Sequence, residues 1–184
     1  MDSAISDYGN IQIEAGNVFG KPINQPVLTE LEAKLTSKLK ACHERKNVAF
    51  VIGGSKDMNL AIAPACDGIT CLVFSTNQTY IDALNGQQVS LPMDMSSLGR
   101  VHVAIDLESV REAEGVTERK DDVSDLYEAS AIAKFLLEAA KTLGRDKLAS
   151  ISITDYNPIL EDQRTGRMLT EFFYRICLGL SMHQ

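Results

Sequence analysis

Four short polar segments of this chain each follow an apolar run that has the length of a β-strand. They lie at 53–57, 75–79, 106–108 and 155–157. The third segment holds the carboxylates of Asp106 and Glu108, which share one face if the backbone there is extended. Two carboxylates on one face suit a divalent cation that prefers oxygen ligands, or a general acid and base pair. The simpler alternative is a pair of hydrated loop charges, which is the more frequent origin of a bare Asp-x-Glu.

The first segment, Gly53-Gly54-Ser55-Lys56-Asp57, leads into a stretch for which Ser55 is a good helix N-cap. A glycine turn before a helix binds anions through backbone N–H groups, so a small molecule or a nucleotide is one candidate ligand. Neither G-x-G-x-x-G nor G-x-x-x-x-G-K-[ST] is present, so both nucleotide motifs fail on spacing. A tight turn without a ligand explains the local sequence more simply.

Histidine and cysteine form no metal-binding pattern. The three histidines have no ligand spacing, and we expect His43 and His183 at the surface and His102 within a sheet. The cysteines offer no second half of a zinc site, and two of them fall on apolar helix faces that are typical of core thiols. The four are Cys42, Cys66, Cys71 and Cys177.

The overall composition excludes several classes of partner. The chain has 184 residues, of which 45% are hydrophobic and 23% charged, and its formal net charge is −7. A polyanion such as nucleic acid, or an anionic membrane, would be repelled by that charge. The apolar runs are too short to span a bilayer, and the first residues lack the order of a signal peptide. Cysteines without framework spacing indicate reduced thiols, so we expect a cytoplasmic protein.

Strands and helices must alternate to position the four polar segments. Apolar runs predict buried strands at 48–52, 70–74, 101–105 and 150–153. Helical spacing of apolar residues predicts helices at 27–45, 56–63, 124–143 and 164–180, with 80–100 the least regular part. We therefore expect one α/β domain over 1–184, with a mostly parallel sheet between two helical layers and an irregular segment at 1–24 that includes a short strand at 10–14. Ligands of such sheets bind at the strands' carboxyl ends.

Taken in order, the four strand ends resemble the ureohydrolase superfamily, which contains arginase, agmatinase and formiminoglutamase. Segments 52–57, 74–79 and 103–108 are similar to the three metal-binding motifs of that family. Segment 152–158, Ser-Ile-Thr-Asp-Tyr-Asn-Pro, with the helix that follows it, is the closest match and leans toward formiminoglutamase-like members. The resemblance implies an arginase-like fold.

The departures from the family motifs bear on function. The resemblance implies two Mn²⁺ ions held by one histidine, an Asp-His-Asp triplet and two aspartates. This chain keeps Asp106 and has the longer Glu108, and the other former ligand positions are Lys56, Ser75, Asn77 and Thr79. Two such ions need several anionic ligands, and the hydrolysis needs the metal-bound hydroxide, so we expect neither metal nor catalysis. We expect Lys56 to pair with Asp106 or Glu108 instead.

The resemblance leaves the substrate side partly in place. Asp155 matches the family's substrate-side glutamate but is one methylene shorter, and Asn157 belongs to the same motif. We treat both as vestigial substrate residues that leave room for a small cationic or amide ligand. Our main hypothesis is a catalytically inactive protein that acts through binding or assembly, for example as a regulatory partner of an active paralogue. The alternative hypotheses are a Mn-dependent hydrolase of C–N bonds in linear amidines, with an atypical site at Asp106 and Glu108, and a ligand-binding protein that uses Gly53-Gly54.

The family's strand order also implies how this sheet is built. Four central strands remain, in the spatial order 48–52, 150–153, 101–105, 70–74. The outer two are apolar edges without proline or charge, and such edges invite pairing. Segment 1–24, segment 80–100 or another subunit must cover them. The two segments are short and rich in turns, so we expect a second copy, or a paralogous subunit, to cover at least one edge.

Overall fold

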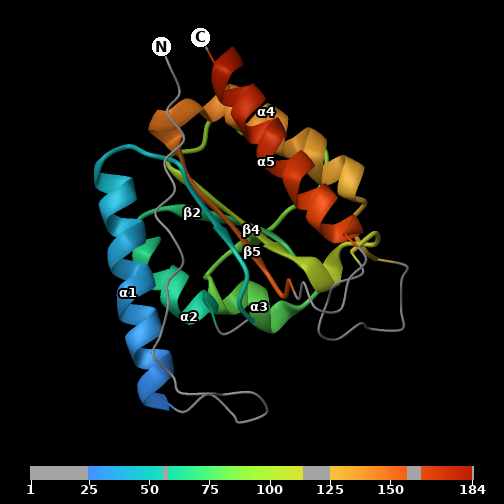
Figure 1. The fold of residues 1–184 in the computed structure, drawn as a ribbon. Coiled ribbons are helices and arrows are strands. Elements are labelled where there is room, and N and C mark those ends of the chain that lie inside the picture. The colour runs from blue at the N-terminus through green and yellow to red at the C-terminus, as the bar shows by residue number, and fades with distance from the viewer. Residues whose placement is uncertain (1–24, 56–57, 114–124, 157–162, 184) are drawn as a thin grey trace.

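A computed structural model of the chain describes residues 25–55, 58–113, 125–156 and 163–183. The segment expected at 1–24, with its short strand at 10–14, lies outside the described residues. Helices and strands alternate along the rest of the chain (Figure 1). They are α1 (Gln25–Glu44), β1 (Ala49–Ile52), α2 (Met58–Ile62), the 3-10 helix η1 (Ala63–Ala65), β2 (Thr70–Phe74), α3 (Gln78–Ala83), β3 (Gln87–Gln88), β4 (Val101–Asp106), the 3-10 helix η2 (Leu107–Ser109), α4 (Ala129–Lys147), β5 (Leu148–Thr154) and α5 (Arg164–Met182).

The strands form one parallel sheet in the order β1-β5-β4-β2-β3. The four predicted strands therefore lie in the predicted spatial order, and the fold class is confirmed. The difference is β3, a fifth strand that adds to β2 through the pairs Leu72–Gln87 and Val73–Gln88. Two exposed glutamines carry none of the β-branched or aromatic character that marks a strand. The strand forms because α3 returns the chain along β2, where the Val89 amide donates to the Val73 carbonyl.

Pairing with β3 covers part of the β2 edge, so segment 80–100, one of the three expected covers, serves this edge. On the other side of the sheet, β1 pairs with β5 and with no second strand among the described residues. Ile52 at the end of β1 is 47% exposed. The expectation that another subunit covers this edge stays a prediction.

Two helical layers enclose the sheet, with α1, α2 and α3 on one face and α4 and α5 on the other (Figure 1). Under α4 and α5 lies a large apolar core to which the odd-numbered residues of β4 and β5 contribute Val103, Ile105, Ile151 and Ile153. A smaller core lies under α1, α2 and α3. Among the described residues, no helix combines the length and the apolar character needed to cross a bilayer.

The helix predicted at 124–143 is placed later in the chain, as α4, and residue 124 lies outside the described residues. Near the end of α4, Gly144 has φ of 59° and ψ of −169° and interrupts the helical backbone. The chain then enters β5 after only three more residues. All of the strands end at one edge of the sheet because every pairing is parallel, and this carboxyl edge brings the four polar segments together.

Candidate functional site

The centre of the carboxyl edge is the carboxylate of Asp106, the last residue of β4, which is fully buried. Ser75 Oγ, just after β2, donates to Asp106 Oδ2 at 2.7 Å, and Ser109 Oγ donates to the same oxygen at 3.1 Å. The backbone N–H of Glu108 donates to Asp106 Oδ1 at 3.1 Å. Bonds from neutral donors to a carboxylate are charge-assisted and stabilise its ionised form.

Ser109 was missed by the sequence analysis. Its hydroxyl also accepts from the Thr76 N–H at 2.8 Å, so it links the end of β2 to η2. The turn that brings Ser109 back to Asp106 has a local signal, because an aspartate often accepts from the N–H two residues later. The sequence analysis considered an extended backbone through Glu108, and that assumption conflicts with this turn.

The expectation that Asp106 and Glu108 share a face is wrong, because β4 ends at Asp106. Residues Leu107–Ser109 form a 3-10 helix whose N-cap is the Asp106 side chain. Asp106 is therefore buried, while Glu108 lies in η2 and is partly exposed. The extended geometry that would present both carboxylates to one cation does not occur.

The other former ligand positions contribute to secondary structure. Asn77 is the N-cap of α3, where its Oδ1 accepts from Thr79 N at 3.0 Å and Tyr80 N at 3.4 Å. Thr79 is exposed in the first turn of that helix. The N–H of Asn77 donates to Ser75 Oγ at 3.0 Å. Lys56 lies outside the described residues, so its expected pairing with Asp106 or Glu108 stays a prediction.

On the substrate side, Asp155 directly follows β5 and is 5% exposed. Its backbone is left-handed, with φ of 64°, and its N–H donates to the Gly54 carbonyl at 2.8 Å. This bond joins the glycine turn after β1 to the end of β5, so these two segments do meet at the edge. Asn157 lies outside the described residues.

These residues do not fit a pair of divalent cations. Where the resemblance places metal ligands, the Ser75 hydroxyl donates its proton to Asp106, and the Asn77 carbonyl oxygen faces two backbone N–H groups. Hard cations need oxygen lone pairs that point to one centre. The part of the chain that the structure describes holds no group of three or more His, Cys, Asp or Glu side chains able to hold a metal ion.

A second polar cluster lies inside the molecule, on the sheet face that α1 covers. Ser150 Oγ is 3.1 Å from His43 Nε2 and 2.8 Å from His102 Nδ1, and Ser152 Oγ is 3.1 Å from His102 Nε2. The expectation of a surface position for His43 is wrong, because the end of α1 packs on the sheet and Ser150 binds the ring. His102 lies within β4, as expected.

Burial keeps both rings of this cluster neutral. It lowers the pKa of His102 to about 3, with a smaller contribution from His43. It also lowers the pKa of His43, where the charge of Arg100 acts in the same direction. The two rings are bonded to serine hydroxyls of β5 inside the protein, and these bonds hold α1 and β4 in place against β5.

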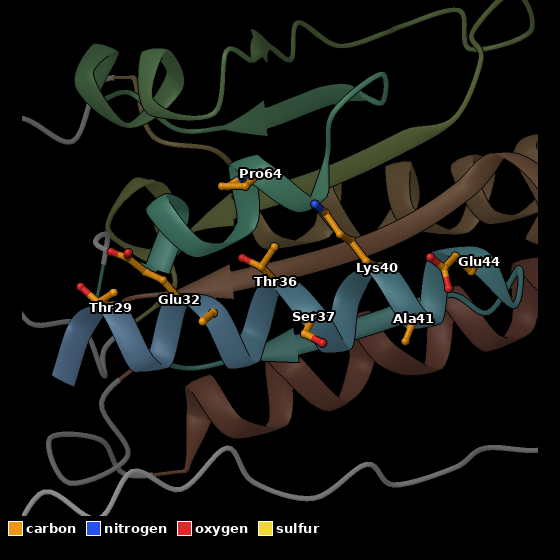
Figure 2. A pocket seen from close by; sticks show the side chains of 9 residues that line it. Thr29, Glu32, Thr36, Ser37, Lys40, Ala41, Glu44 and Pro64 are labelled. Atoms are coloured by element: carbon orange, nitrogen blue, oxygen red, sulfur yellow. The ribbon is translucent and has the colours of Figure 1, made fainter. Parts of the chain in front are cut away.

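One surface hollow among the described residues lies away from this edge. A groove of about 650 Å³ runs along α1 beside Pro64 of η1 (Figure 2). In it Thr36 already donates to the Ala61 carbonyl at 2.6 Å, and Lys40 shares the lining with Glu32 and Glu44. Charges of both signs in an open groove give little basis for selecting a ligand.

Removal of the Ser75 hydroxyl should destabilise the protein. Ser75→Ala leaves the buried Asp106 carboxylate without its shortest hydrogen bond, at an expected cost of about 1–3 kcal/mol in free energy of unfolding. Urea denaturation measures this, with Ser97→Ala at an exposed position as the control. Equal unfolding free energies for the two variants would contradict the role given to Ser75.

His102 should make the fold sensitive to acid. The unfolded chain binds a proton at a pKa near 6.5 and the folded chain only near 3, so stability is fully present above pH 6.5 and falls as the pH drops toward 3. From pH 6.5 to about 5, His102 alone should account for about 1.5 kcal/mol of lost stability. The loss should be smaller in His102→Gln and unchanged in His183→Gln. Parallel pH profiles for the wild type and His102→Gln would refute this.

Comparison by sequence finds no relative, because no family model and no curated protein matches the chain. Comparison by structure finds proteins of similar fold. Arginase from Bacillus subtilis subsp. subtilis str. 168 matches with a TM-score of 0.71 at 14% identity, over 94% of this chain and 84% of the other. Trypanosoma cruzi formiminoglutamase with Mn²⁺ gives 0.68 at 16%, over 88% and 75%. Agmatine ureohydrolase of Thermoplasma volcanium gives 0.62 at 9%, over 84% and 70%.

At identities this low, the structural likeness shows a common fold and nothing beyond it. The likeness agrees with the motifs that first indicated the fold, since arginase, formiminoglutamase and agmatine ureohydrolase all appear among the matches. The chain has an arginase-like α/β fold.

Proposed function

We propose that this chain is a catalytically inactive arginase- and formiminoglutamase-like protein that acts through binding or assembly, with regulation of an active paralogue as one form of that assembly. The observation that supports this most is the set of bonds around Asp106. Three donors from Ser75, Ser109 and Glu108 surround the one aspartate kept from the metal motifs. Ser75 and Asn77, at two of the former ligand positions, are engaged in hydrogen bonds within the protein.

The chemistry of the family explains why these bonds bear on activity. Hydrolysis of a C–N bond at neutral pH needs an activated water, and two metal ions supply it by lowering the pKa of water. A serine hydroxyl and a capping asparagine provide no equivalent. An imidazole base is not available at the edge either, because His102 is held in the interior by Ser150 and Ser152.

A Mn-dependent hydrolase of linear amidines is the alternative function. It is favoured by the retention of two carboxylates, Asp106 and Glu108, within one short segment. It is disfavoured by η2, which separates the buried carboxylate from the partly exposed one. It is also disfavoured by the donors that already occupy both oxygens of Asp106.

A binding function remains compatible with the edge. Asp155 is buried beside the glycine turn and Asp106 is buried next to it on the neighbouring strand, since Asp106 and Thr154 are paired in register. Two carboxylates in a low-dielectric environment favour a ligand with N–H donors. We therefore include a small cationic or amide ligand in the proposal.

An assembly function has its own support in β1. The outer side of this strand pairs with no other strand among the described residues, and its residues are apolar and only partly buried. Strand edges of this composition pair with other chains. A second copy of the chain is the first candidate partner and an active paralogue is the second.

Metal analysis tests the inactive state directly. After loading with Mn²⁺ and removal of free metal, the protein should retain well under one ion per chain. It should also release no urea or ammonia from linear amidines and guanidines such as arginine or agmatine. The matched variant is Ser75→Asp, which restores one carboxylate next to Asp106. Stoichiometric Mn²⁺ with measurable turnover in the unchanged protein would favour the hydrolase.

Sedimentation velocity at micromolar concentration tests assembly. The proposal expects a species larger than the monomer, and Ile52→Lys at the exposed end of β1 should shift it toward the monomer. The control is Tyr174→Lys, a change to an exposed side chain on α5. A wild-type protein that sediments as a monomer would refute self-association, and a paralogue would then be the remaining candidate partner.

A further inference from the structure

Two of the four cysteines lie together at the amino end of β2, on the opposite edge of the sheet from Asp106. Cys66 follows η1 and Cys71 is the second residue of β2, and both thiols are buried. The Ile69 N–H donates to the Cys66 carbonyl at 2.9 Å, and Gly68 is left-handed with φ of 70°. These features close a tight turn, and the two cysteines therefore lie on its two arms.

Both thiols point to the same face of the sheet. Cys71 is paired in register with His102, and His102 with Ser150, so the three side chains lie on one face. The Cys66 thiol interacts with the Ser150 hydroxyl on that face, and its S–H donates to the Cys71 sulfur. Both cysteines belong to the smaller core under α1, α2 and α3. The fold thus brings two reduced thiols into contact.

A surface hollow reaches one thiol of the pair. The hollow has a volume of about 650 Å³, and its lining includes Cys66, Asp67, Thr70 and Asn85. Of the two cysteines, Cys66 alone belongs to this lining. A small molecule that enters the hollow therefore meets the Cys66 sulfur first, with the Cys71 sulfur directly behind it.

Contact between the thiols also determines how they ionise. The S–H of Cys66 lowers the pKa of Cys71, against the effect of burial, and the same bond raises the pKa of Cys66, which burial raises further. When the pair loses its first proton, the second proton lies between two sulfurs, and the ionisation belongs to the pair. Transfer of that proton makes either sulfur the thiolate, which is the form that attacks a disulfide.

We propose that Cys66 and Cys71 form a redox-active dithiol, which a small disulfide compound entering the hollow converts to an intrachain disulfide. The Cys66 sulfur attacks one sulfur of the compound, forms a mixed disulfide and releases the other half as a thiol. The Cys71 sulfur then attacks Cys66, forms the intrachain bond and releases the second half as a thiol. The two electrons and two protons that the cysteines lose pass to these two thiols. A thiol compound in excess reverses both steps.

Exchange with bis(2-hydroxyethyl) disulfide at neutral pH tests the proposal in the unchanged protein. Remaining free thiols are alkylated in denaturant, and tryptic peptides are analysed by mass spectrometry. Cleavage after Lys56 and Arg100 leaves both cysteines in the peptide 57–100, which should lose the mass of two hydrogen atoms and take up no alkylating group. Cys177, in α5 on the other face of the sheet, should stop at the mixed disulfide (Figure 1). Dithiothreitol should reverse both products.

Single-cysteine variants separate the two steps. Cys71→Ser should keep the first step and lose the second, so the mixed disulfide should accumulate at Cys66. Cys66→Ser should lose the intrachain disulfide, because the remaining Cys71 is not part of the hollow. The matched control, Cys177→Ser, should form the intrachain disulfide as the wild type does. Where a buried serine prevents folding, the corresponding alanine variant replaces it with the same expectation.

Other products would overturn the proposal. Recovery of Cys66 and Cys71 as free thiols, in a protein whose Cys177 has been modified, would show a pair of core thiols only. A bond from either cysteine to Cys42 or to a second chain would refute the intrachain pair. A mixed disulfide that persists at Cys66 in the wild type would refute the role of Cys71. The site is remote from the carboxyl edge, so these results are independent of metal content and of the proposed binding function.

Discussion

The carboxyl edge of this sheet depends on the buried carboxylate of Asp106. Removing a carboxylate from water without partners costs several kcal/mol or more, so a fully buried aspartate requires donors at fixed positions. Ser75 and Ser109 supply hydroxyls and Glu108 supplies its backbone N–H. These donors come from the end of β2 and from η2, and satisfying the charge therefore fixes how two neighbouring strands end.

The hydrogen bonds around Asp106 also position residues beyond the carboxylate itself. Ser75 donates to Asp106 and accepts from the Asn77 N–H, which orients Asn77 to cap α3. The cap starts a helix that places Tyr80 under the sheet, where its hydroxyl meets Thr154 of β5. One chain of contacts thus links the ends of β2, β4 and β5. Hydroxyl and amide groups position this edge through hydrogen bonds within the protein. The replacement of metal ligands by these groups is the physical basis for proposing an inactive protein with an intact fold.

The sequence predicted those parts of the fold that depend on local apolar pattern. The four apolar runs gave the four long strands, and similarity of the motifs to a known family gave their order. The features that the sequence did not predict are those that depend on tertiary contacts. Gln87–Gln88 becomes a strand only because α3 returns it to β2, and the turn after Asp106 is held by Ser109, whose hydroxyl accepts from the Thr76 N–H. His43 is buried because Ser150, far away in the sequence, binds its ring.

The face of the sheet under α1, α2 and α3 shows how polar pairs inside the protein fix the register of β5. Ser150, Ser152 and Thr154 alternate along β5 with apolar residues, and each meets a partner from a different element, namely α1, β4 and α3. A slip of one residue in β5 would turn Ile151 and Ile153 toward those partners, so the bonded pairs fix the register.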